Sequence, residues 1–78
     1  MSQNIGKVVE IIGPVVDIQF SQNNLPDLLT AIEIERPNEE NLIVEVEQDI
    51  GADRVRCIAM GSTDGLVRGM DAIDTKKP

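Results

Sequence analysis

The chain contains no histidine, and its only aromatic residue is Phe20. Histidine is the commonest general base in enzymes and the commonest protein ligand for metal ions, so its absence argues against both kinds of site. A serine or threonine paired with a lysine is formally possible, but the lysines lie near the two ends of the chain, at positions 7, 76 and 77. We therefore expect no catalytic, cofactor-binding or metal-binding residue in this chain.

Cysteine is also scarce, because Cys57 is the only one in the sequence. A single cysteine cannot form an internal disulfide. Among strand-forming residues it is usually a small buried apolar side chain, in a protein kept in a reducing compartment. We expect Cys57 in the core.

Positive charge is in short supply as well. Seven basic residues stand against fourteen acidic ones, which gives a formal net charge of −7. Proteins bind nucleic acids through lysine and arginine, and binding to single strands also uses aromatic stacking. Anionic lipid attracts polybasic segments. No apolar run is long enough to span a bilayer, and the first residues do not resemble a signal peptide. These features disfavour nucleic-acid binding and direct membrane insertion.

The chain is instead rich in short segments with alternating apolar residues. Its 78 residues, 41% of them hydrophobic, fit a single domain over residues 1–78, with a frayed start at residues 1–4. The stretch Gly6–Phe20 joins two β-branched segments at the corner Gly13-Pro14. Residues 61–69 read as a loop with Leu66 and Val67 turned inward. The predicted strands are Gly6–Ile12, Val15–Phe20, Ala31–Glu35, Leu42–Gln48, Arg54–Met60 and Met70–Asp74.

Six short strands in so small a chain predict an all-β fold. Two well-covered sheets would need a larger core, whereas closure removes exposed sheet edges. We therefore predict a small closed six-stranded antiparallel β-barrel.

The two strands around residues 49–53 predict a β-hairpin with a definite register. If paired residue numbers sum to 101, Glu47 faces Arg54 and Glu45 faces Arg56, while Val46 meets Val55 on the other face. The same register pairs Val44 with Cys57 and Leu42 with Ala59. It also places Ile43, Ile58 and Met60 on the charged outer face. These three residues are either a candidate interface or ordinary stray apolar residues on a surface.

Other motifs favour structural explanations. Glycines at positions 61, 65 and 69 are better explained by turns than by a membrane-helix GxxxG motif. No glycine-rich phosphate loop ending in Lys-Ser or Lys-Thr is present. The pairs Glu33/Glu35 and Glu45/Glu47 could bind a hard cation or act as acid and base, but solvated strand faces give the same spacing.

Three segments carry a family resemblance. They are IGPVVDIQF at residues 12–20, VRCIAM at residues 55–60 and STDGLVRGM at residues 62–70. In this order and spacing they strongly resemble the amino-terminal domain of F-type ATP synthase beta subunits, and the resemblance runs from Ile5 to Thr75. One departure is Lys76, which follows Asp74-Thr75 where the family usually has glycine.

The resemblance implies a six-stranded barrel that joins alternating alpha and beta subunits in a ring. The partners would be ATP synthase alpha subunits. It also implies a nucleotide-binding domain beyond Pro78, toward which residues 75–78 would form a linker. The sites for ATP or ADP and magnesium would lie in that absent part, so this chain alone would not be an enzyme. The parent complex would make or hydrolyse ATP coupled to proton or sodium flow, as a peripheral complex on the cytoplasmic side of an energy-coupling membrane. The isolated domain would be soluble.

Two other classes of function stay open at this point. One is a free-standing small barrel that binds a peptide or oligonucleotide on its outer strands. The other is a small acid–base or metal enzyme, for which only the carboxylate pairs speak.

Overall fold

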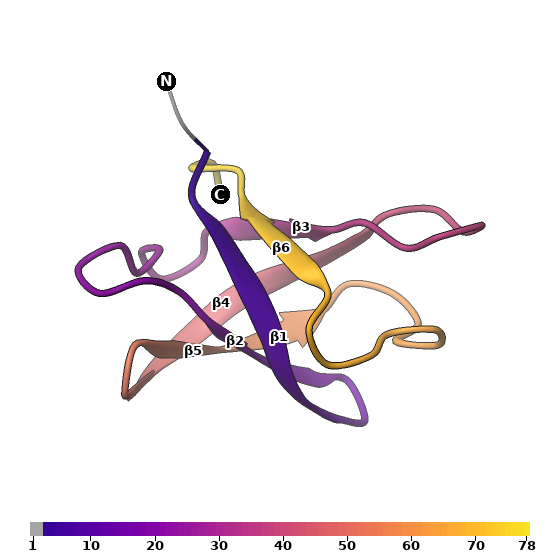
Figure 1. Cartoon of the computed structure of the whole chain (residues 1–78), viewed down its shortest axis with the longest axis horizontal. Helices are drawn as coiled ribbons and strands as arrows, with labels where there is room; N and C mark the ends of the chain where they lie inside the picture. The colour runs from indigo at the N-terminus through magenta and orange to yellow at the C-terminus, as the bar shows by residue number, and fades with distance from the viewer. Residues whose placement is uncertain (1–2) are drawn as a thin grey trace.

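The computed structural model describes residues 3–78, in which six antiparallel strands close into a barrel (Figure 1). The order around the barrel is β1-β2-β5-β4-β3-β6, and the pairing of β1 with β6 completes the cylinder. No helix occurs among the described residues. The all-β, six-stranded closed barrel expected from the sequence is therefore confirmed. The strands are β1 (Ile5–Ile12), β2 (Val15–Gln19), β3 (Ala31–Ile34), β4 (Leu42–Gly51), β5 (Arg54–Ala59) and β6 (Asp71–Asp74).

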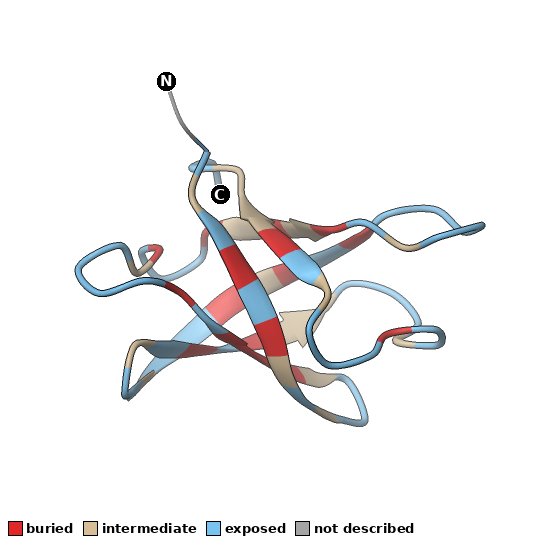
Figure 2. Ribbon diagram, in the orientation of Figure 1, coloured by how far each residue is buried: buried red, intermediate tan, exposed pale blue. Residues whose placement is uncertain are grey.

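Alternation along the strands builds the core. Buried and exposed positions follow one another along β1 and β4 (Figure 2), because successive side chains point to opposite faces of a strand. Aliphatic side chains fill the interior almost alone, with Phe20 as the single aromatic ring. The buried apolar residues are Val8, Val16, Ile18, Phe20, Ile32, Ile34, Leu42, Val44, Val46, Val55, Cys57, Leu66 and Ala72.

Gly6 allows β1 to pass close to the end of β2. A Cβ at this position would lie 2.7 Å from the Gln19 carbonyl oxygen and 2.9 Å from Phe20 Cδ1. Phe20 lies just beyond β2, where its side chain is buried and its amide donates to the Asp53 carbonyl oxygen at 2.9 Å. The close approach of these two segments therefore requires glycine.

The predicted register of the β4–β5 hairpin is wrong. Val46 faces Cys57 rather than Val55, and Val44 faces Ala59 rather than Cys57. Because the shift is two residues here, Val44, Glu45 and Val46 keep their predicted faces of the sheet. Closer to the turn, the register shifts twice more, between Val46 and Gln48 and between Asp49 and Gly51.

The tight turn and the neighbouring strand β2 explain this register. Ala52 and Asp53 both have positive φ values, 55° and 61°, as in a two-residue type I′ turn, so the turn is shorter than the predicted loop 49–53. β4 consequently runs on to Gly51, and bulges absorb its extra residues. On its other side β5 pairs with β2, which sets Arg56 opposite Asp17.

The loop at residues 61–69 matches its prediction only in part. Leu66 is buried as predicted, but Val67 is 57% exposed rather than turned inward.

Of the expected frayed start, residues 1 and 2 lie outside the described residues. Asn4 is not frayed, because its Nδ2 donates to the Asn24 carbonyl oxygen and its own carbonyl accepts from the Asp74 amide. Thr75 and Lys77, in the predicted linker, both hydrogen bond to Ala31.

Candidate interface on the outer face of the barrel

The three residues proposed from the sequence as a candidate interface lie together on the outer face of β4 and β5. Ile58 faces Glu45 across the two strands. Just past the end of β5, the Met60 amide donates to the Ile43 carbonyl oxygen at 2.8 Å, so these two residues are cross-strand neighbours. Met60 is 57% exposed and Ile43 37%, while Ile58 is half-buried.

Two further apolar residues extend this group across β2 to β1. Val15 pairs with Ile58 on one side and with Ile12 on the other, and Ile12 is 64% exposed. Directly paired residues project from the same face of a sheet, with Cα atoms about 4.5–5.5 Å apart. We call this set the outer apolar patch: Ile12, Val15, Ile43, Ile58 and Met60.

Sequence reasoning missed Ile12 and Val15 as members of the patch. The outward direction of Val15 was implicit, because Val16 and Ile18, on the same strand, point inward. What the sequence did not supply was the pairing of β2 with β5, which brings Val15 beside Ile58. That pairing is a consequence of barrel closure and not of any local pattern.

An ion pair borders the patch. Two nitrogens of the Arg56 guanidinium, Nε and Nη2, each donate a hydrogen bond to the Asp17 carboxylate at 3.0 Å. Asp17 is only 6% exposed although it lies on the outer side of β2, and its carboxylate raises the pKa of Arg56. The expected pairing of Arg56 with Glu45 is therefore wrong.

The change of partner leaves two carboxylates side by side. Glu45 and Glu47 project from the outer face of β4, and a hydrogen bond with Glu45 raises the pKa of Glu47 above its ordinary value. Among residues 3–78 neither one forms a salt bridge, so the predicted pairing of Glu47 with Arg54 is also not found. Glu33, on β3, accepts a hydrogen bond from Asn41 Nδ2 at 2.8 Å. In the part of the chain that the structure describes, no group of three or more potential metal-ligating side chains comes together.

Cys57 lies in the core, as expected. Burial raises the pKa of its thiol to about 12, and the carboxylates of Asp17 and Glu47 add to the effect. Because the thiolate is the nucleophilic form of cysteine, the thiol is unreactive near neutral pH.

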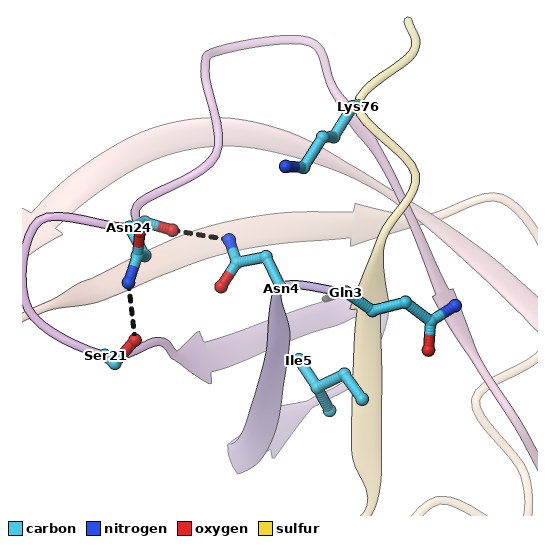
Figure 3. A pocket seen from close by; sticks show the side chains of 6 residues that line it. All are labelled: Gln3, Asn4, Ile5, Ser21, Asn24 and Lys76. Atoms are coloured by element: carbon cyan, nitrogen blue, oxygen red, sulfur yellow. Dashed lines mark hydrogen bonds between the residues drawn. The ribbon is translucent and has the colours of Figure 1, made fainter. Parts of the chain in front are cut away.

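A small polar cleft lies elsewhere, where the start of β1 meets the β2–β3 loop and the end of the chain (Figure 3). Its volume is about 300 Å³. Asn4 Nδ2 donates to the Asn24 carbonyl oxygen, and Asn24 Nδ2 donates to Ser21 Oγ at 2.9 Å (Figure 3). These bonds tie the β2–β3 loop to β1, which accounts for the polar side chains. The lining residues are Gln3, Asn4, Ile5, Ser21, Asn24 and Lys76.

Residues 3–78 contain no helix with the length and apolar character needed to cross a membrane.

Comparison with known families identifies the fold. The model of the ATP synthase alpha/beta family, beta-barrel domain, matches residues 8–76. The match covers all of β2 to β6 and most of β1, including every strand that contributes to the outer apolar patch. The chain therefore belongs to the ATP synthase alpha/beta family, as its beta-barrel domain.

Proposed function

We propose that this chain is the crown domain of the catalytic beta subunit of an F-type ATP synthase, and that it holds alternating alpha and beta subunits in a ring. The family match over residues 8–76 is the observation that carries the proposal. The assignment to beta rather than alpha rests on the segments IGPVVDIQF, VRCIAM and STDGLVRGM, which resemble beta subunits.

The barrel is suited to a joining role rather than to chemistry. Its interior is filled by aliphatic side chains, so it has no room for a substrate there. Its outer face carries the exposed apolar side chains of Ile12, Ile43 and Met60, which suit contact with another protein. Exposed apolar groups on a closed barrel can be covered only from outside.

The rest of the proposal concerns the parent complex. ATP, ADP and magnesium would bind to a separate nucleotide-binding domain of the parent subunit. The complex would make or hydrolyse ATP coupled to proton or sodium flow, attached peripherally to the cytoplasmic side of an energy-coupling membrane. The barrel would hold the subunits together while those other domains change shape.

A graft tests this function. Residues 5–75 would replace the corresponding barrel of an F-type beta subunit that assembles with its alpha subunit, and native mass spectrometry would count the subunits. As the matched control, the same residues would replace the barrel of the alpha subunit. Nucleotide binding by each grafted subunit confirms that its other domains are folded.

We expect alternating hexamers from the beta graft and few or none from the alpha graft. Hexamers from the alpha graft alone would show that the chain takes the alpha position in the ring. Failure of both folded grafts to assemble would contradict the ring role itself.

A further inference from the structure

The outer apolar patch continues across four strands of the barrel. Cross-strand pairs link Ile12 to Val15 and Val15 to Ile58, and a backbone hydrogen bond links Met60 to Ile43. These are exposed or half-buried apolar residues at adjacent positions of one sheet. Contiguous exposed apolar surface of this kind marks a contact site more often than isolated residues do.

Carboxylates border the patch where β3 and β4 adjoin it. Glu45 lies directly opposite Ile58, and Glu33 lies directly opposite Ile43. Glu47 also projects from the outer face of β4, where the neighbouring Glu45 raises its pKa. This border is therefore acidic.

The cations of the neighbouring strand do not neutralise this border. Arg56 is engaged by Asp17 on the opposite side of β5. Arg54 lies at the far end of β5, opposite Gln19 and Gly51. A partner that covers the patch would thus meet carboxylates whose positive counterparts it must itself supply.

We infer that the outer apolar patch docks onto a different polypeptide, whose facing surface is apolar at its centre and carries lysine or arginine opposite Glu33, Glu45 and Glu47. The inference rests on the proposed function, since the occupant is the barrel of the neighbouring subunit in the ring. It adds which face is used and what charge the neighbour presents.

Charge also decides against a second copy of this chain as the occupant. Each copy carries a formal charge of −7, and two copies joined through this patch would bring their acidic borders together. Juxtaposed like charges oppose association and slow the encounter. A basic partner surface would instead be attracted, with an affinity that falls as salt screens the charges.

The area expected for such an interface guides the choice of experiment. A stable protein interface takes about 800 Å² from each partner. The whole barrel exposes 4895 Å², so such an interface would occupy about a sixth of its surface. Isolated barrels offer only part of the contact in a full ring, so we expect weak binding, which methyl NMR detects at high concentration.

The experiment is an NMR titration of the isotope-labelled chain with the barrel domain of an F-type ATP synthase alpha subunit. The variants are Met60→Glu in the patch and Leu28→Glu as its control. Leu28 is 61% exposed against 57% for Met60, and it lies in the β2–β3 loop, at the opposite end of β2 from the Ile12–Val15 hairpin. Both variants add one negative charge at an exposed site, so their folding should be equally little affected.

The charge of the border is tested separately. Glu45→Gln removes one carboxylate next to the patch, and Asp27→Asn removes one from the distant β2–β3 loop. Each variant is titrated at low and high salt, so that the change in the salt dependence can be compared at equal net charge.

We expect saturable shifts of the Ile43, Ile58 and Met60 methyl signals. Met60→Glu should weaken binding by about tenfold, as loss of a central apolar contact does, and Leu28→Glu should not. Glu45→Gln should weaken binding by about twofold to fivefold and reduce its salt dependence, as a border charge does, whereas Asp27→Asn should do neither.

The remaining outcomes separate the two proposals. Saturable shifts confined to another face, such as the Leu28 and Leu29 methyls, would overturn the inference and leave the ring function standing. Binding through the patch that strengthens with added salt would contradict a basic partner surface. Equally large shifts on titration with unlabelled copies of this chain would contradict it as well. No saturable shift from the alpha barrel would overturn the proposed function and the inference with it.

Discussion

At the scale of single residues, one ion pair on the outside of the barrel stands out. Asp17 is nearly inaccessible to solvent on the outer side of β2, and Arg56 satisfies its carboxylate with two hydrogen bonds. A charged group that is removed from water needs such partners, because losing them exposes the full cost of its desolvation. The pair fixes β2 against β5 next to the outer apolar patch.

Replacing Arg56 should therefore destabilise the barrel more than replacing its neighbour Arg54. We expect Arg56→Met to lower the urea midpoint of unfolding clearly. Leaving a buried carboxylate such as that of Asp17 without hydrogen-bond donors lowers the free energy of unfolding by about 1–3 kcal/mol. Arg54→Met removes a similar exposed arginine that has no salt bridge among the described residues. Equal midpoints for the two variants would contradict a stabilising role for the pair.

A second residue-scale prediction concerns the pH dependence of stability. Folding raises the pKa of the Cys57 thiol from its ordinary value of 9.0 to about 12. The pKa of the thiol is higher in the folded state than in the unfolded state. The contribution of Cys57 to the free energy of unfolding is therefore complete below pH 9 and is lost as the pH rises from 9 toward 12. Each unit of difference in pKa corresponds to about 1.4 kcal/mol.

Urea unfolding of the parent and of Cys57→Ala between pH 7 and 11 measures this contribution. We expect the parent to lose stability relative to Cys57→Ala only above pH 9, while other alkaline titrations affect both proteins alike. Parallel curves over the whole range would show that the thiol is not shielded in the folded barrel.

At the scale of the strands, the sequence predicts which segments are extended and which face is buried. Val44, Val46, Val55 and Cys57 all point inward as expected, because alternation is a local property of each strand. The register was not predictable in the same way. It depends on the type I′ turn at Ala52-Asp53, where neither residue is glycine or asparagine, and on β2, which meets β5 only when the barrel closes.

The candidate interface shows the same division. Ile43, Ile58 and Met60 were placed on the outer face by alternation alone, and a two-residue error in register left that face unchanged. The predicted salt-bridge partners of Glu45 and Glu47 were wrong, because a salt bridge between strands depends on which residues lie directly opposite each other. Faces are thus read from a single strand, whereas pairs require the neighbours of that strand.

Gly6 provides a test of the close approach between β1 and the end of β2. In Gly6→Ala the new Cβ would meet the Gln19 carbonyl oxygen at 2.7 Å, and a paired backbone atom cannot move aside cheaply. We expect a loss of about 1–3 kcal/mol in the free energy of unfolding, as overpacking usually causes.

Gly61→Ala is the matched control for this substitution. The nearest atom to its Cβ would be Leu42 Cδ1 at 3.5 Å, which is ordinary contact at the end of a flexible side chain. We expect it to unfold at nearly the parent's urea concentration. If Gly6→Ala is no less stable than Gly61→Ala, β1 does not approach the end of β2 as closely as described.

At the scale of the whole molecule, the barrel combines an aliphatic interior with an asymmetric exterior. The outer apolar patch occupies one part of its surface. The Arg56–Asp17 ion pair borders it on β2 and β5, and the Lys7–Asp71 ion pair joins β1 and β6. A ring of unlike subunits uses heterologous contacts, in which each surface meets a different one on its neighbour. A small barrel with a localised patch suits such an arrangement.

A prediction at this scale concerns nucleotides. Because the proposed nucleotide site belongs to another domain of the parent subunit, we expect isothermal titration calorimetry of this chain with magnesium-ATP to show only heats of dilution. The parent subunit of the same ATP synthase is the positive control. A saturable binding isotherm for the chain alone would contradict its assignment as a purely joining domain.

Sedimentation equilibrium tests the central claim most directly, since it reports which chains associate and in what ratio. The account predicts that this 8.5 kDa chain alone remains a monomer, and that with the alpha-subunit barrel at high concentration it forms a one-to-one complex that weakens with salt. A stable homo-oligomer of the chain alone, with no mixed complex, would contradict the account.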